Sequence, residues 1–366
     1  MAFLNFIIWN GNPEIVSFTL PFLDFHVTLR WYGLLFALGF LLSQQILYYI
    51  FKREGKSEKD VDTLTIYMVV ATVIGARLGH VLFYEPARYL AEPLDILKIW
   101  EGGLASHGAA AGILFALWLY ARKRKPGQSY LQTLDRIVIL VALTGALIRL
   151  GNFFNSEIIG KPTNSDYGVV FARNVSDVLK SQGYVESVSY VADDTTQHVG
   201  GYPAIKILVE FYKGENSRDD YATYLNGSIN SFLTYHNYAK DHIYQPSYIN
   251  YRLGQDENGK YNAVIYTHAI PRHPAQLYES ISCFLLFGLL LWIWSRHKVS
   301  LPSGRLFGIF LIVCFGLRFL YEFLKEAQVD FENTMALNMG QLLSIPLVLF
   351  GIFVLIRSYK SNNELN

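Results

Sequence analysis

Charged and polar side chains stand inside an otherwise apolar stretch, "LDRIVILVALTGALIRLGNFFNSE". At about 100° per residue, Arg149, Asn152 and Ser156 fall within about 60° of one another on a helix. They would form one polar stripe, with Asn155 and Glu157 flanking its end. A side-chain set of this kind can bind an anion and hold it by hydrogen bonds.

Arg149 is the most unusual member of this set, because a charge within hydrocarbon costs a few kcal/mol and marks a candidate functional site. No acidic residue lies within one turn on its own face. We therefore expect either a carboxylate from another helix or an anion supplied by a ligand. Arg318, in a second apolar stretch, would let two guanidinium forks clamp a phosphate. An anionic phospholipid is then the natural ligand.

Other ionisable residues have both functional and structural interpretations. Arg318 and Glu322 lie one turn apart and could simply neutralise each other. Arg272 stands at the entrance of a helix that begins near Pro274. Close helix packing is the favoured interpretation of a set of glycines in two neighbouring stretches, namely residues 75, 79, 102, 103, 108 and 112.

The composition of the chain indicates whether these residues lie in water or in a membrane. The 366 residues are 52% hydrophobic and 17% charged, and the mean hydropathy is +0.22. These values are typical of a polytopic membrane protein. The net charge of +1 excludes a large electrostatic footprint for nucleic acid. Cys283 and Cys314 lie in apolar runs, as buried small hydrophobes do.

The predicted fold is an all-α polytopic membrane protein with about seven transmembrane helices. Stretches of about 20 apolar residues can cross the bilayer, and they fall near 31–51, 62–84, 104–121, 134–154, 274–296, 304–324 and 340–357. Basic residues gather in alternate loops, at 52–60, 122–125 and 296–305. The positive-inside rule then places the N-terminus outside and the C-terminus in the cytoplasm.

A long polar segment interrupts the helices and is predicted to be a small α+β extracytoplasmic insert. "AIKILVEFY" and "KYNAVIYTH" alternate as strands do, and "SRDDYATYLNGSINSFLTYHNY" is predicted to be helical. The expected organisation is an outer N-terminal arm, four spans, the insert, three spans and a cytoplasmic tail, at 1–30, 31–160, 161–271, 272–358 and 359–366.

Ordered motifs along the chain resemble those of the prolipoprotein diacylglyceryl transferases, bacterial inner-membrane enzymes. The similar segments are "RWYGLLFALGF", "GARLGHVLFY", "WEGGLASHG", "LIRLGNFFNSEIIGKP", "RHPAQLYES", "FGLRFLYEFLKE" and "MGQLLSIP". They occur in the family's order and include nearly every predicted span. The insert at 162–270 lies outside the resemblance.

The resemblance implies transfer of diacylglyceryl from phosphatidylglycerol to the lipobox cysteine of a prolipoprotein, with release of glycerol phosphate. His107 matches the family histidine proposed to assist the thiol, and Arg149 and Arg318 match its essential arginines. Further matching or candidate substrate-binding residues are Tyr32, Asn152, Glu157, Gly160, Glu322 and Arg272. The implied partners are phosphatidylglycerol, prolipoprotein signal peptides and membrane lipids.

Some positions depart from the family pattern. Ala109 and Ser156 stand where the family usually has glycine, and Ile159 and Lys161 replace an aromatic residue and an arginine. These changes affect the local backbone more than the chemistry. The enlarged insert is a further departure, and we expect it to cap the outer side of the site and to help admit the signal peptide.

Two other functions are compatible with polar residues in the spans. An anion or lipid transporter would also use arginines, but the sequence has no repeated halves and no matched pair of broken helices. A non-catalytic lipid-binding scaffold would keep the two arginines without needing His107. We expect no cofactor and no metal, because the histidines lack paired ligand spacing.

Overall fold

The computed structural model describes residues 6–20, 25–99, 102–103, 105–123, 125–165, 167–214, 216–326, 332 and 335–363. The chain divides into two compact units. The first unit comprises Met1–Leu35, Ile148–Glu279 and Leu320–Asn338. The second unit comprises Phe36–Leu147, Ser280–Phe319 and Met339–Asn366.

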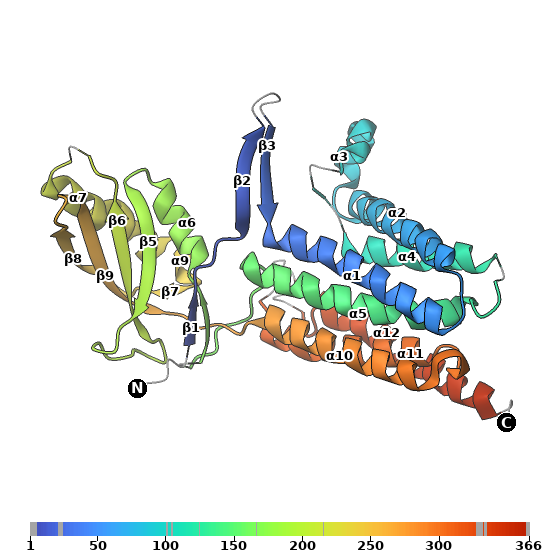
Figure 1. Ribbon diagram of the computed structural model, residues 1–366. Helices are drawn as coiled ribbons and strands as arrows, with labels where there is room; N and C mark the ends of the chain where they lie inside the picture. Colours follow the sequence, from blue (N-terminus) through green and yellow to red (C-terminus); the bar gives the residue numbers. More distant parts are fainter. Residues whose placement is uncertain are drawn as a thin grey trace. The chain divides into compact units, whose positions relative to one another are not determined.

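Six helices are long and apolar enough to cross a membrane. They are α1 (Trp31–Arg53), α2 (Glu58–Phe83), α5 (Tyr130–Phe154), α10 (Ala275–His297), α11 (Arg305–Tyr321) and α12 (Met339–Asn363) (Figure 1). The other predicted span forms α4 (Ser106–Ala121), whose 16 residues are fewer than the about 20 that a bilayer requires. The structure thus confirms a mostly helical protein with several potential spans, whereas the number seven stays a prediction.

Glycines let α2 and α4 pack with their backbones in contact. A Cβ added to Gly75 would lie 2.5 Å from the carbonyl oxygen of Gly108, and one on Gly79 would lie 2.7 Å from the Cα of Gly108. A Cβ on Gly112 would meet the carbonyl oxygen of Ala71 at 2.6 Å. The structure therefore confirms close helix approach as the role of these glycines.

Arg77 organises the segment between these two helices, which contains α3 (Pro86–Ala91) and the 3₁₀ turn η1 (Pro93–Leu97). Its guanidinium donates to the carbonyl oxygens of Ile96 at 2.9 Å and Gly102 at 2.6 Å. Gly102 and Gly103 have φ of 88° and 70°, a region that favours glycine. The buried arginine thus fixes the backbone that leads into α4.

The predicted insert is a small α+β structure. Its sheet has the order β5-β6-β9-β7, and β8 also pairs with β9 (Figure 1). The strands are β5 (Val185–Ala192), β6 (Ala204–Phe211), β7 (Ile243–Tyr244), β8 (Asn250–Gln255) and β9 (Tyr261–Ala269). Both predicted strands are confirmed, as β6 and β9.

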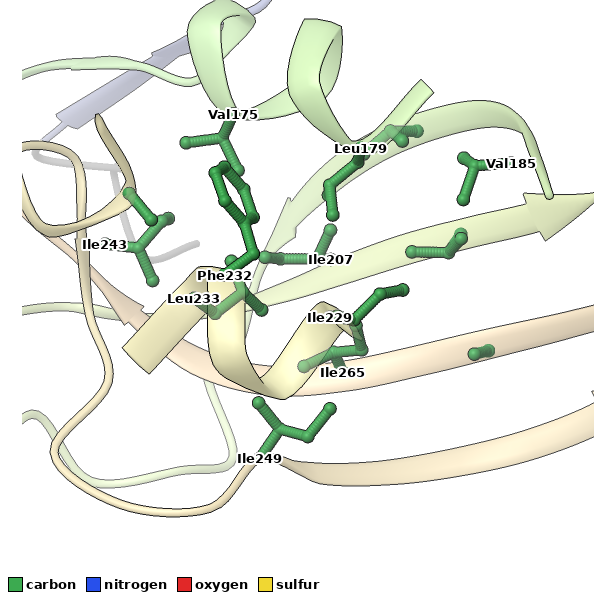
Figure 2. Close-up of a cluster of buried hydrophobic side chains, with 14 of the residues drawn as sticks. Val175, Leu179, Val185, Ile207, Ile229, Phe232, Leu233, Ile243, Ile249 and Ile265 are labelled. Atoms are coloured by element: carbon green, nitrogen blue, oxygen red, sulfur yellow. The ribbon is translucent and has the colours of Figure 1, made fainter. Parts of the chain in front are cut away.

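Helices complete the insert. They are α6 (Arg173–Ser181), α7 (Arg218–Tyr224), the π-helical turn η3 (Leu225–Ile229), α8 (Asn230–Tyr235) and α9 (Asn237–Lys240). The four that follow Ser217 confirm the predicted helical segment. Figure 2 shows Val175 and Leu179 of α6 beside Ile207 of the sheet. These side chains are fully buried, so the insert has a hydrophobic core of its own.

The N-terminal segment joins the insert through a parallel strand pair. β1 (Phe6–Trp9) pairs with β4 (Gly168–Phe171), with Phe6 opposite Gly168. Phe6 is buried in the same core as α6 and the sheet. A second strand pair, β2 (Glu14–Leu20) with β3 (Phe25–Arg30), is antiparallel and leads directly into α1.

Candidate active site

Arg149 lies near the end of α5 and has a protein carboxylate as its partner. Its Nε lies 2.5 Å from Oε2 of Glu279 on α10 in an ion pair, and its Nη1 donates a hydrogen bond to Oδ1 of Asn152 at 3.3 Å. The side chain is 23% exposed. Of the two sequence-based alternatives for its counter-ion, the structure therefore shows a carboxylate from another helix.

Glu279 joins Arg149 to a second cation. Its other carboxylate oxygen, Oε1, pairs with Nζ of Lys325. Lys325 also donates to Glu322 at 3.1 Å, and Asn338 donates to the remaining oxygen of Glu322 at 3.1 Å. Arg149, Glu279, Lys325 and Glu322 thus form a continuous ion-pair network in the first unit, in which all but Arg149 are buried.

Sequence reasoning did not single out Glu279 and Lys325, although both belong to quoted motifs, "RHPAQLYES" and "FGLRFLYEFLKE". Because Arg149 has no acidic neighbour on its own face, the sequence signal for its partner is a carboxylate near the end of another span. Glu279, four residues after the start of α10, is such a carboxylate.

A chain of hydrogen bonds also runs from Arg149 to the residues at the end of α5. Asn152 donates to Oε1 of Glu157 at 2.7 Å, and Asn155 donates to the same oxygen at 3.3 Å. Gln276 donates to the backbone oxygen of Glu157 at 2.6 Å. Glu157 thus orients Arg149 through Asn152.

The predicted polar stripe is shorter than the sequence suggested. α5 ends at Phe154, so Ser156 lies beyond the helix. Its φ is 54°, in the left-handed region where a side chain is strained and glycine is favoured. This backbone conformation explains why a glycine suits position 156, where the chain has serine.

Gly160 and Arg272 fix the loop that follows. A Cβ on Gly160 would lie 2.5 Å from the carbonyl oxygen of His273, so no other residue fits there without movement. Arg272 is buried and donates to the backbone oxygen of Gly160 at 3.1 Å, to Glu326 at 2.6 Å and to the backbone oxygen of Asp241 at 2.6 Å. These contacts give Arg272 a positioning role, and its direct contact with substrate stays a prediction.

Tyr32 lies in the first turn of α1, against the helix that carries Arg149. A Cβ on Gly151 would lie 3.0 Å from the Cα of Tyr32, so glycine permits this close approach. The ring of Trp31 stacks on Phe154 with centroids 5.0 Å apart. Tyr32 is half-buried and is held beside the end of α5.

The remaining two predicted residues belong to the second unit. His107 lies in the first turn of α4 with an exposed side chain, and its ring packs against Phe83 and Tyr84 with centroids 5.3 and 5.8 Å apart. Arg318 lies in the last turn of α11 and is half-buried. Over the part of the chain that the structure describes, no group of three or more His, Cys, Asp or Glu side chains could hold a metal ion.

The geometry at Arg149 suits an anionic ligand. A guanidinium carries N–H donors on all three nitrogens, and those on Nη2 make no hydrogen bond to any residue that the structure describes. The arginine therefore has a rigid protein contact on one edge and donors to spare on another. Guanidinium donors of this kind can bind an oxyanion such as a phosphate.

The six potential spans fit a multi-pass membrane protein. The family model of prolipoprotein diacylglyceryl transferase matches residues 21–357. The chain belongs to this family, as its motifs indicated.

Curated relatives agree with this assignment. A protein of Tolumonas auensis is 34% identical over 97% of this chain and 98% of its own length. Proteins of Chloroherpeton thalassium and Porphyromonas gingivalis are each 34% identical over 97% of this chain and 96% of their own length. All three are named phosphatidylglycerol–prolipoprotein diacylglyceryl transferase.

Proposed function

We propose that this protein transfers the diacylglyceryl group of phosphatidylglycerol to the cysteine thiol of a prolipoprotein, in the first step of lipoprotein maturation. The cysteine sulfur forms a bond to the glycerol carbon, and the bond from that carbon to the phosphate oxygen breaks. The products are a thioether and glycerol phosphate. The observation that carries this proposal is Arg149, which is tied to Glu279 on one edge and keeps donors for a phosphate.

The proposed role of Arg149 is to bind the lipid phosphate and to stabilise the charge that develops as glycerol phosphate departs. Arg318 is assigned the same work because it matches the family's second arginine. Glu279 and Asn152 hold the Arg149 guanidinium in one orientation. Pre-oriented donors of this kind stabilise developing charge without reorganisation during the reaction.

The proposed role of His107 is to accept the proton of the cysteine thiol. A free cysteine has an ordinary pKa of about 8.5, so the small thiolate fraction near neutral pH limits its attack. A histidine that accepts the thiol proton would raise this fraction. Tyr32, Asn152, Glu157, Gly160, Glu322 and Arg272 are the proposed substrate-binding or positioning residues.

The proposed topology has seven spans, with α4 as the third, the N-terminus outside and the C-terminus in the cytoplasm of a bacterial inner membrane. It keeps the predicted divisions of the chain at 1–30, 31–160, 161–271, 272–358 and 359–366. The site then faces the outer side, where the signal peptide and its lipobox cysteine arrive. The independent core of the insert supports its proposed role as a cap over that side.

Transport is the competing function. Arginines in spans can also conduct anions, but the family and the names of the relatives favour the transferase. A scaffold that only binds lipid differs from the enzyme in having no thiol-dependent product. An assay of thiol-dependent glycerol phosphate release therefore separates the transferase from both a transporter and a scaffold.

The test uses purified full-length protein, phosphatidylglycerol and a lipobox peptide. We expect glycerol phosphate release that requires the peptide thiol, is lost with a peptide that carries serine in place of cysteine, and is lost in Arg149→Gln. His107→Ala should lose release while retaining lipid binding. Ser295→Ala, on an exposed helical position, is the matched control and should release product at the parental rate. No release from folded, lipid-loaded parent protein would overturn the proposal.

A further inference from the structure

A hollow of about 460 Å³ lies at the turn between α4 and α5, within the second unit. The end of α4 contributes Trp118 and Arg122, the connecting loop contributes Lys125, and Ser129 and Tyr130 stand at the start of α5. Among the described residues that line the hollow, two are cations and none is a carboxylate. A hollow of this size and charge can receive an anionic group.

The two cations differ in their availability to a ligand. Lys125 pairs with Asp60, which also accepts a hydrogen bond from Gln128 at 2.6 Å. Arg122 is exposed, and its guanidinium carbon lies 5.1 Å from the centroid of the Trp118 ring. With the residues that the structure describes, the Arg122 side chain makes neither an ion pair nor a hydrogen bond. Its forked N–H donors are therefore available to a phosphate.

An apolar surface of α4 continues from the hollow. Phe115, Trp118 and Leu119 lie on one face of the helix and are 59%, 45% and 38% exposed. The rings of Phe115 and Trp118 stack with centroids 5.7 Å apart. Tryptophan and arginine together are typical of the boundary between lipid and water. A free phosphate ion would leave this apolar surface exposed, whereas the acyl chains of a phospholipid would cover it.

We infer that this hollow binds the phosphate of an anionic phospholipid whose acyl chains lie along Phe115, Trp118 and Leu119. The site lies in the second unit, whereas Arg149 belongs to the first. In the proposed topology, the lipid comes from the cytoplasmic leaflet. α4 has only 16 residues and carries His107 in its first turn. A headgroup bound at the other end of α4 holds this short helix at one depth in the bilayer, so the lipid acts as an anchor.

The end of α10 offers a matched control in the same unit. Arg296 follows Trp292 by four residues, as Arg122 follows Trp118, and its guanidinium carbon lies 5.8 Å from the centroid of that ring. Arg296 and Trp292 are both exposed, and neither lines the hollow. A general effect of positive charge should therefore be equal in Arg122→Gln and Arg296→Gln.

The test measures binding of phosphatidylglycerol to detergent-solubilised full-length protein by native mass spectrometry. Every protein carries Arg149→Gln, so that the proposed substrate guanidinium makes no contribution. This background is compared with the same background carrying Arg122→Gln or Arg296→Gln. The ligand controls are phosphatidylcholine, which has no net charge, and glycerol phosphate, which has no acyl chains. Thermal unfolding midpoints without added lipid check that all three proteins fold.

We expect the phosphatidylglycerol concentration at half occupancy to rise about tenfold in Arg122→Gln, because a charge-assisted hydrogen bond is lost. It should stay unchanged in Arg296→Gln, and both ligand controls should bind much more weakly. An equal effect of the two substitutions, or no effect of either, would overturn the inference. Equal binding of phosphatidylcholine would exclude recognition of the negative charge, and equal binding of glycerol phosphate would show a site for soluble phosphates. Either result would also overturn it. The readout is independent of transferase activity.

Discussion

In each of the two compact units an arginine pairs with a glutamate, yet the two arginines differ in the donors that they leave for another partner. In the second unit, Nε and Nη2 of Arg136 donate to Glu54 at 3.0 and 2.7 Å, and Nη1 donates to the carbonyl oxygen of Gln132 at 3.1 Å. The Arg136 side chain is 3% exposed and that of Glu54 is not exposed. In the first unit, Arg149 is 23% exposed and keeps Nη2 donors.

The difference shows that residue type alone does not separate a structural ion pair from a binding site. Glu54 also accepts from Lys56 at 2.6 Å and from the indole of Trp294 at 2.7 Å. Every nitrogen of Arg136 has a partner, so this cluster is closed. In the cluster around Arg149, Nη2 makes no hydrogen bond to a residue that the structure describes, which supports the proposal that this cluster binds the substrate.

The largest expected effect is on stability, from Arg136→Ala. Its removal leaves the fully buried Glu54 with fewer partners, and breaking a buried pair costs about 3–5 kcal/mol. Thermal or denaturant unfolding in detergent measures the loss. Turnover per folded molecule should stay near the parental value, and a variant that loses turnover without losing stability would contradict the comparison.

Arg149→Lys should show the opposite behaviour. Lysine keeps the charge but lacks the planar fork, so we expect kcat/KM to fall about 10²–10³-fold. The unfolding midpoint should change little, because Glu279 still pairs with Lys325. A large drop in midpoint together with the loss of activity would make Arg149 a structural residue like Arg136.

Acidification should lower the stability of the first unit, because His242 is protonated more readily in the unfolded chain than in the folded one. Burial, with added repulsion from Arg272, lowers the pKa of His242 to about 4. The unfolded chain binds a proton below its ordinary pKa of about 6.5, whereas the folded chain stays neutral. The contribution of His242 to the free energy of unfolding is therefore greatest above pH 6.5 and falls by about 3 kcal/mol between there and pH 4.

Unfolding midpoints of the parent and His242→Gln, measured between pH 4 and pH 8, test this. The unfolding midpoint of His242→Gln should fall less on acidification than that of the parent. An identical decline in both proteins would exclude His242 as its source. Arg136→Ala provides the comparison, since its loss of stability is expected at neutral pH as well.

The smallest expected effect comes from a helix cap in the second unit. Asp135 on α5 accepts hydrogen bonds from the backbone N–H groups of Gly304 at 2.7 Å and Phe307 at 2.9 Å, which satisfies the start of α11. Asp135→Asn removes the charge and one acceptor, so we expect a loss of about 1 kcal/mol. Asp135→Ala should cost more, and equal stability of all three proteins would show that the cap contributes nothing.

The sequence by itself determined the local structure. Apolar stretches predicted the helices, alternation predicted β6 and β9, and Arg149 and Asn152, three residues apart on α5, do form a hydrogen bond. These features follow from backbone periodicities of 3.6 and 2 residues, which a short segment already contains. The motifs likewise identified the family, because each is a continuous run of residues.

The tertiary structure alone decided which partners meet. Glu279 pairs with Arg149 although the two residues are 130 positions apart in the chain (279 − 149). Likewise, β1 pairs with β4 although Phe6 and Gly168 lie far apart in the chain. The end of α5 at Phe154 also excluded Ser156 from the polar stripe. Local periodicity contains no information on such pairings, because packing between elements decides them.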